Sequence, residues 1–490
     1  MTQPQRRSGT DPARQAAYDV LRAVADSDAY ANLVLPGMLA ERRLGRRDAA
    51  FATELAYGTL RLRGRYDAVL ERCSSRSLRE IDPRVLDALR LGAHQLLGMR
   101  VPPHAAVGET VNLVRGVAGP GAATFANAVL RSVGRASRQE WFARLEREIP
   151  DETERLATIE AHPTWIVREL RASLAQQRQH DGDEHLIDQP TLEGELRELL
   201  RADNEAPQVT LVARPGLVDD RELEEADELG RLESHPAAPT AWLLRSGSPE
   251  RIPALRQGRM GVQDAGSQLV TLAMAGASIE GTDDLWADLC AGPGGKSALL
   301  GAVLAERAGR DEVGAAADAP PMLVAGEVQP HRVGLVRRSV KAIPSEHVEV
   351  VEWDGRTLGE EHPEHFDRIL VDAPCTGLGA LRRRPESRWR RQPADVPALT
   401  ALQTDLLDSA LRAVRPGGVV GYVTCSPHLA ETRAVVDRAV ARRDVEVLDA
   451  VAAARDAGAR LDGLGEGPYL QLWPHRHGTD AMFLALLRRR

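Results

Sequence analysis

Cysteine is scarce in this sequence. The four cysteines, Cys73, Cys290, Cys375 and Cys425, are widely separated along 490 residues. No two of them have the close spacing of a zinc-binding pair, and together they lack the density of a disulfide framework. We therefore expect free thiols and no bound metal.

Long apolar runs and aromatic residues are also rare. No stretch approaches the ~20 consecutive apolar residues that a membrane helix needs. The first residues, 1–7, lack the apolar core of a signal peptide. Aromatic residues make up 4% of the chain, while the hydrophobic content of 43% is ordinary for a soluble protein. We expect a cytoplasmic protein, and we further expect it to be monomeric.

Lysine is almost missing, because arginine supplies nearly all of the positive charge, and that charge is unevenly distributed. Residues 1–140 contain 21 arginines, no lysine and 14 acidic residues, so this part carries +7. Since the whole chain carries −8, the remaining residues carry −15. A basic module on an acidic body is expected of a protein that binds a polyanion. An arginine-rich helical surface exposed to solvent would have the same charge.

The length predicts two to four domains, and the hydrophobic pattern separates three. Residues 10–138 have the periodicity of amphipathic helices, which predicts an all-α domain. Residues 139–258 combine helical segments with short strand-like runs, which predicts a small α+β module. From 259 to 490 strands and helices alternate, which is typical of a Rossmann-like parallel sheet with helices on both faces. The expected strands of that sheet are 285–289, 322–328, 348–353, 368–371, 418–423, 445–448, 469–472 and 482–487. Residues 308–321, rich in Ala, Asp, Gly and Pro, are predicted to be an enlarged loop.

A glycine-rich turn follows the first of these strands. Residues 288–297 read Asp-Leu-Cys-Ala-Gly-Pro-Gly-Gly-Lys-Ser. A phosphate-binding loop would need glycine in place of Cys290, and the dinucleotide motif would need glycine in place of Ser297. The turn therefore predicts a ligand without a pyrophosphate, such as S-adenosylmethionine. The expected contacts are Cys290, Ala291, Gly292, Pro293, Gly294, Gly295 and Lys296.

Acidic residues follow the next two strands. Glu327 ends the second strand, where a carboxylate suits the two hydroxyls of a ribose. Asp354 follows the third strand and is placed to meet the edge of an adenine, although a solvent-exposed loop acid would have the same position. Arg332 is a further candidate for cofactor binding.

Two thiols and an acid follow two later strands. Asp372 and Cys375 lie in the turn after residues 368–371, and Cys425 lies in the turn after residues 418–423. A thiolate is the best protein nucleophile near neutral pH. Carbon 5 of a pyrimidine accepts a methyl group poorly until a nucleophile adds to carbon 6. The sequence therefore favours methylation of cytosine, oriented by Asp372. The spacing leaves open which thiol attacks and which assists the elimination.

These segments resemble the RNA cytosine carbon-5 methyltransferases. The resemblance is carried by residues 262–268, 288–297, 372–379, 424–426 and 471–480. It implies that Cys425 of the Thr-Cys-Ser motif is the nucleophile and that Cys375 aids product release, with Lys296 also in the catalytic set. The chain differs mildly from the family. It has Gly292 and Ser297 where the family usually has Ala and Thr, and Glu327 where Asp is common. It also has Asp480-Ala-Met-Phe where Asp-Gly-Phe-Phe is usual.

The amino-terminal region resembles the NusB-like RNA-binding domain. The resemblance rests on residues 51–61, 89–97, 101–105 and 125–131, taken in this order. It implies that the helical domain binds RNA, with Arg14, Arg61, Arg63 and Arg131 as candidates for phosphate contact. A second basic run, 382–391, follows the Cys375 turn and suits RNA phosphates and a stacked base. Its candidates are Arg382, Arg383, Arg388 and Arg390.

The sequence therefore predicts an S-adenosylmethionine-dependent RNA cytosine-C5 methyltransferase. The two resemblances together indicate the bacterial subgroup that acts on small-subunit ribosomal RNA. Two alternatives stay open. One is the same reaction on transfer RNA. The other is a non-catalytic RNA-binding assembly factor, against which the presence of Cys425, Cys375 and Lys296 argues.

Overall fold

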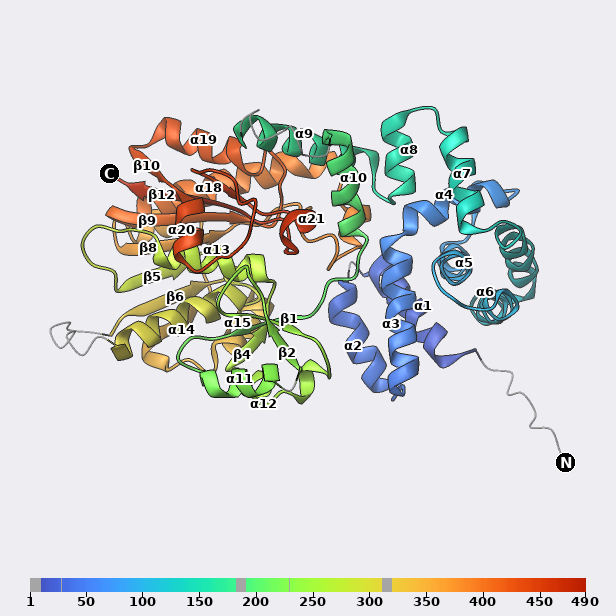
Figure 1. Cartoon of the computed structure of the whole chain (residues 1–490), viewed down its shortest axis with the longest axis horizontal. Helices are drawn as coiled ribbons and strands as arrows, with labels where there is room; N and C mark the ends of the chain where they lie inside the picture. The colour runs from blue at the N-terminus through green and yellow to red at the C-terminus, as the bar shows by residue number, and fades with distance from the viewer. Residues whose placement is uncertain (1–9, 28, 182–190, 229, 311–319) are drawn as a thin grey trace. The chain divides into compact units, whose positions relative to one another are not determined.

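The computed structural model describes residues 10–27, 29–181, 191–228, 230–310 and 320–490 (Figure 1). Its contacts separate two compact units. The helical unit contains the described residues up to Arg168 together with Glu193–Ala206 and Leu381–Arg391. The sheet unit contains the rest. No helix among the described residues is long and apolar enough to cross a membrane.

The helical unit begins as the sequence predicts. Asp11 caps the first helix by accepting a hydrogen bond from the backbone N–H of Arg14, and Pro12 occupies the first turn, where its missing N–H has no cost. The helices are α1 Pro12–Asp26, α2 Ala31–Glu41, α3 Arg46–Arg61, α4 Arg63–Cys73, α5 Pro83–Leu97, α6 Pro103–Val133, α7 Arg138–Glu148 and α8 Glu152–Ile159. Their apolar faces form one core that includes Leu21, Leu55, Leu89 and Leu130. The predicted all-α domain is confirmed.

The segment 381–391 packs with these helices, although its neighbours in the sequence belong to the sheet unit. It contains the short helix α17, Ser387–Arg390. The indole N–H of Trp389 donates to the carbonyl of Leu60 at 2.8 Å, and Arg390 donates to the carbonyl of Val24 at 2.8 Å. Hydrogen bonds to helix-end carbonyls thus hold the segment in place.

The middle of the chain forms a small antiparallel sheet. Its strand order is β2-β3-β1-β4. The elements are β1 Thr210–Ala213, α11 Asp220–Glu228, β2 Leu232–Ser234, β3 Ala241–Leu244, α12 Pro253–Gln257 and β4 Met260–Val262. Along the chain, α9 Thr164–Asp181 and α10 Leu192–Asp203 precede it. The predicted combination of helices and short strands is present.

The large sheet has the order β10-β12-β9-β8-β5-β6-β7, with β11 paired to β12. Its strands are β5 Leu285–Asp288, β6 Met322–Gly326, β7 Val348–Val351, β8 Phe366–Asp372, β9 Val414–Thr424, β10 Val445–Leu448, β11 Leu470–Gln471 and β12 Phe483–Arg489. The strands β7, β6, β5, β8 and β9 are parallel to one another, as predicted. The late strands β10, β11 and β12 pair antiparallel, so the sheet is mixed.

Helices cover both faces of this sheet. Successive side chains along a strand point to opposite faces, so neighbouring buried residues belong to different cores. Trp286 contacts the core on the side of α13 Ala265–Gly276, α14 Gly295–Arg310 and α20 Ala450–Asp456, while Ala287 contacts the other core. That second core includes α16 Leu358–Glu361, α18 Val396–Ala413 and α19 Arg433–Arg442. The remaining helices are α15 Pro330–Val340 and α21 Pro474–His477. Most of the predicted loop 308–321 lies outside the described residues.

Candidate active site

The carboxyl ends of the five parallel strands lie at one edge of the sheet. This edge carries the turns that follow β5, β6, β7, β8 and β9. Every residue predicted to bind the cofactor or to take part in catalysis lies at the last residue of one of these strands, in the turn after it or in the first turn of the helix that follows.

The turn after β5 is fastened by a buried acid. Asp288 is fully buried and accepts hydrogen bonds from the hydroxyl of Ser297 at 2.7 Å and from the backbone N–H of Cys290 at 3.3 Å. Burial raises the pKa of Asp288 to about 7, against the opposing effect of the Ser297 hydrogen bond. Asp288 therefore joins the end of β5 to the first turn of α14.

Two glycines of this turn are required by its close packing. Gly294 has a φ of +106°, and a Cβ atom there would lie 2.6 Å from the Cβ of Ser339. A Cβ atom at Gly292 would lie 2.2 Å from a carboxylate oxygen of Glu327. The glycines thus let the turn approach α15 and the end of β6.

Glu327 contacts the glycine turn directly. Its side chain is buried, and its carboxylate accepts from the backbone N–H of Gly292 at 3.1 Å and from that of Gln329 at 3.0 Å. Arg332 lies 3.4 Å from the same carboxylate and donates to the carbonyl oxygen of Gly292. Glu327 therefore binds the backbone N–H of Gly292, and Arg332 binds its carbonyl oxygen, so the two side chains together position the turn. This positioning could not be predicted from the sequence.

The turn after β7 contains Trp353 and Asp354. The indole ring occupies the space beside Gly326, where a Cβ atom would meet the ring nitrogen at 1.3 Å. Among the described residues the buried ring N–H has no hydrogen-bond partner. Asp354 is paired with Arg356, whose guanidinium contacts both carboxylate oxygens. The sequence predicted Asp354 but not Trp353, because an isolated aromatic residue beside a strand is usually core.

Lys296 and Asp372 form an ion pair between the turns after β5 and β8. The Lys296 Nζ lies 2.8 Å from a carboxylate oxygen of Asp372. Burial disfavours the ammonium, but the attraction of Asp372 and its hydrogen bond outweigh this, and the pKa of Lys296 is raised. Lys296 therefore stays charged and fixes the orientation of Asp372.

The two thiols meet. The Sγ atoms of Cys375 and Cys425 are 3.4 Å apart, although the residues are 50 positions apart in the chain. The hydrogen bond to Cys425 raises the pKa of Cys375 well above the ordinary value, and burial and the charges of Cys425 and Glu431 add to the effect. Cys375 therefore keeps its proton at neutral pH and can share it with Cys425.

A buried carboxylate behind the thiols binds both of their turns. Glu431 is fully buried and accepts hydrogen bonds from the backbone N–H of Thr376 at 2.7 Å and from the hydroxyl of Ser426 at 2.7 Å. It also accepts from the hydroxyl of Thr376 and from the side-chain amide of Gln403. Thr376 follows Cys375 and Ser426 follows Cys425, so one carboxylate fixes the residue after each thiol. Glu431 could not be predicted from the sequence, because an acid near the start of a helix is usually exposed.

Several arginines predicted to bind RNA are buried instead. Arg388 has no exposed surface and donates to the carbonyls of Arg61 and Ala161 and to the side chain of Asn204 at 3.2, 3.1 and 2.8 Å. Arg388 was predicted to contact RNA, but its guanidinium has no exposed surface and is bound by helix-end carbonyls.

Arg61 and Arg14 are also buried, at 5% and 9% exposure, so neither presents the phosphate-binding surface that was expected. Arg61 donates to the carbonyl of Arg382, and Arg14 donates to Gln95. Arg382 is 9% exposed, while Arg131 is exposed on α6.

Comparison with known proteins is consistent with this geometry. The family model described as 16S rRNA methyltransferase RsmB/F matches residues 279–488, and the NusB family model matches residues 11–135. A protein of Mycobacterium tuberculosis named "Putative methyltransferase Rv1407" is 47% identical over 99% of this chain and 98% of its own length. The chain belongs to the 16S rRNA methyltransferase RsmB/F family.

More distant relatives and solved structures agree. The ribosomal RNA small subunit methyltransferase B of an Enterobacter species is 28% identical over 97% of this chain and 98% of its own length. The crystal structure of PH0851 has a TM-score of 0.76 and 20% identity, covering 98% of this chain and 99% of that chain. At that identity the likeness concerns the fold. The chain is thus an RNA methyltransferase with a NusB-like helical domain, and its methyl donor is S-adenosylmethionine.

The residues at the sheet edge fit this cofactor. The unpartnered indole N–H of Trp353 and the acids Glu327 and Asp354 lie at the ends of adjacent strands, where a nucleoside would find a donor and two acceptors. Within the part of the chain that the structure describes, no group of three or more His, Cys, Asp and Glu side chains is arranged to hold a metal ion.

Proposed function

We propose that this protein methylates carbon 5 of a cytosine in small-subunit ribosomal RNA through a covalent bond between Cys425 and carbon 6. The observation that carries the proposal is the 3.4 Å contact between the Cys375 and Cys425 thiols beside the Lys296–Asp372 ion pair. Such a site holds a nucleophile, a second thiol and an acceptor for a base amino group. A ribosomal RNA substrate also agrees with the predicted cytoplasmic location.

The reaction begins when the Cys425 thiolate adds to carbon 6 of cytosine and forms a C–S bond. The electron pair of the carbon 5–carbon 6 double bond then makes carbon 5 nucleophilic. Bound S-adenosylmethionine supplies a methyl cation equivalent from its sulfonium. The proton on carbon 5 passes to a water molecule, and the electron pair of that C–H bond restores the double bond as the C–S bond breaks and the Cys425 thiolate leaves. Cys375 is the group beside Cys425 that can take part in this elimination.

Asp372 orients the base during these steps. Its carboxylate accepts a hydrogen bond from the exocyclic amino group, which cytosine has and uracil lacks. Lys296 keeps Asp372 in place and stays protonated, because its pKa is raised. Glu327, Arg332 and the glycine turn are proposed to hold the cofactor, with Trp353 and Asp354 at its adenosine end.

The test compares two single-thiol variants. Cys425→Ala should reduce methyl transfer to unmethylated small-subunit RNA to background, because no nucleophile reaches carbon 6. Cys375→Ala should accumulate a covalent protein–RNA adduct, seen as a retarded band in a denaturing gel. Cys73→Ala, which removes a thiol of the helical unit, should behave as wild type. Full activity of Cys425→Ala would contradict the covalent mechanism.

Bisulfite sequencing of RNA from a deletion strain identifies the substrate. Loss of one protected cytosine in small-subunit ribosomal RNA is expected. Loss of protection in a transfer RNA would assign the same chemistry to that substrate. Unchanged methylation in both, with impaired ribosome assembly, would favour a non-catalytic assembly factor.

A further inference from the structure

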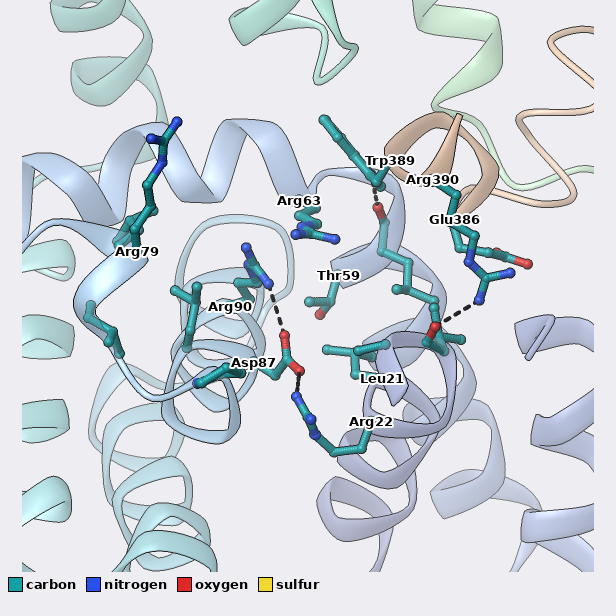
Figure 2. Close-up of a pocket in the computed structure, with 17 residues that line it drawn as sticks. Leu21, Arg22, Thr59, Arg63, Arg79, Asp87, Arg90, Glu386, Trp389 and Arg390 are labelled. Atoms are coloured by element: carbon teal, nitrogen blue, oxygen red, sulfur yellow. Dashed lines mark hydrogen bonds and ion pairs between the residues drawn. The ribbon is translucent and has the colours of Figure 1, made fainter. Parts of the chain in front are cut away.

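A pocket in the helical unit has the charge and shape of a nucleotide site (Figure 2). Its volume is about 430 Å³, which lies in the range of small-molecule sites. The walls come from α1, from the junction of α3 and α4, from the turn before α5, from α5 itself and from α17. All of these elements belong to the helical unit.

Positive charge dominates the lining. Five arginines and two acids line the pocket. The acid Asp87 is already paired with Arg22 at 2.7 Å and with Arg90 at 2.9 Å. The second acid, Glu386, accepts a hydrogen bond from the N–H of Ala31 at the start of α2. The acids are therefore committed to neighbours within the unit.

Arg63 is only weakly compensated by an acid. Its side chain is 39% exposed, and its Nε atom is 3.7 Å from Asp67, whose carboxylate already accepts two hydrogen bonds from Arg90. Partial desolvation of the guanidinium and then repulsion by Arg90 lower the pKa of Arg63, and a bound anion would offset that repulsion. Figure 2 shows Arg63 and Arg90 together in the middle of the pocket, with the exposed Arg79 on one side.

Trp389 provides an aromatic wall on the other side of Arg63 (Figure 2). Its N–H bond to Leu60 fixes the ring, which is partly exposed, and the Arg63 guanidinium lies 5.9 Å from the ring centroid. Gly64 makes room for the ring, because a Cβ atom there would lie 2.4 Å from it. A fixed indole beside guanidinium groups combines base stacking with phosphate binding.

We infer that this pocket binds one nucleotide of the single-stranded substrate RNA, with its phosphate at Arg63 and its base against Trp389, while Arg79 adds positive charge at the edge of the pocket. The inference rests on the proposed function, because it assumes an RNA substrate. It adds an RNA-binding site separate from the thiols. Trp389 and Arg390 belong to the basic run 382–391, which was predicted to bind RNA. In the structure both residues line this pocket among the helices.

The experiment measures binding of an unmethylated small-subunit RNA fragment by the full-length protein across a series of salt concentrations. Arg63→Ala and Arg79→Ala should each weaken binding and reduce the slope of log K against log salt by about one. Trp389→Ala and Gly64→Ala should weaken binding about tenfold with the slope unchanged, because stacking carries no charge. Trp389→Phe should restore much of the loss.

The matched control is Arg115→Ala, which removes an exposed arginine of α6 outside the pocket. In methyl-transfer assays the pocket variants should raise the KM for RNA and keep kcat. Pocket variants that bind like Arg115→Ala would overturn the inference. The inference would also be overturned if the wild-type protein bound cytidine monophosphate or inorganic phosphate tightly while Arg63→Ala left RNA binding unchanged. The pocket would then be a site for a small anion and not for RNA. Failure of wild type to methylate any RNA would instead reject the proposed function.

Discussion

At the scale of single residues, the buried Glu431 side chain links the two turns that carry the thiols. It binds the residue that follows each thiol, so the positions of Cys375 and Cys425 depend on the same carboxylate. Its negative charge also contributes to the raised pKa of Cys375. Geometry and proton affinity are therefore coupled through one buried side chain.

Substitution of Glu431 separates these two effects. Glu431→Ala leaves the buried backbone N–H of Thr376 without its acceptor and removes one acceptor each from Ser426 and Gln403, so we expect it to lower stability by about 3 kcal/mol and to remove most activity. Glu431→Gln keeps the shape but not the charge. It should shift alkylation of Cys375 by iodoacetamide to lower pH, measured by mass spectrometry of the Cys375 peptide. An unchanged pH profile in Glu431→Gln would show that the charge has no such effect.

The sequence revealed residues with distinctive chemistry and missed those whose function depends on burial. Cys375, Cys425 and Asp372 could be predicted because thiols and acids at strand ends are conspicuous. Glu431 and Trp353 could not, since their residue types have ordinary structural roles in most helices and strands. Only the fold shows that one is buried behind the thiols and the other fills the space beside a glycine.

At the scale of elements, the junction of β5 and α14 contains a buried ionisable group. The pKa of Asp288 is about 7 in the folded protein, mainly because of burial, against an ordinary value of 3.8. The folded state thus holds this proton more tightly than the unfolded state. Its contribution to stability is complete at pH values below about 4, is lost as the pH rises to about 7, and is constant above that.

Asp288→Asn should remove this pH dependence. Asparagine is neutral throughout and its carbonyl can still accept from Ser297. We expect the stability of the variant to rise relative to wild type between pH 4 and pH 7, by up to about 4 kcal/mol. Urea unfolding at several pH values measures the difference. Asp444→Asn, at an exposed aspartate, is the control and should show no such trend. A constant difference for Asp288→Asn would be inconsistent with the raised pKa.

Strand positions were predictable, but part of their pairing was not. Alternating strands and helices correctly predicted β5 to β9 as a parallel set, because each crossover contains a helix. The chain from β9 to β10 also contains a helix, α19, and β10 does run parallel to β9, but β12 lies between them and pairs antiparallel with both. The last strand, β12, inserts between β9 and β10, and the local sequence does not specify this position.

At the scale of the whole molecule, the helical unit is discontinuous in sequence. Its segment 381–391 is attached by Arg388, whose buried guanidinium binds carbonyls of Arg61, Ala161 and Asp203. Burial lowers the pKa of Arg388 to about 9, and the attraction of the Asp203 charge only partly opposes this effect. The basic character of residues 381–391 is evident from the sequence. Their packing with the helices of the amino-terminal region can be seen only in the folded structure.

Substitution of Arg388 tests this attachment. Arg388→Ala leaves several buried carbonyls unpartnered and should lower the stability of the protein by about 3 kcal/mol, measured by thermal unfolding. Arg388→Lys keeps a donor and should lose less. Arg384→Ala, at an exposed arginine of the same segment, is the control. Wild-type stability of Arg388→Ala, together with a reduced salt dependence of RNA binding, would restore the interpretation of Arg388 as a phosphate contact.

The discontinuity of the helical unit sets an order of events during synthesis. The ribosome completes the main body of helices at Arg168, but the segment 381–391 follows more than two hundred residues later. At a translation rate of about 5–20 residues per second, the helices wait roughly 10–45 seconds for it. Until then the carbonyls that bind Arg388 and the surface that binds Trp389 are open. The pocket inferred to bind RNA can therefore form only after most of the sheet unit has been translated, so a truncated chain would lack it.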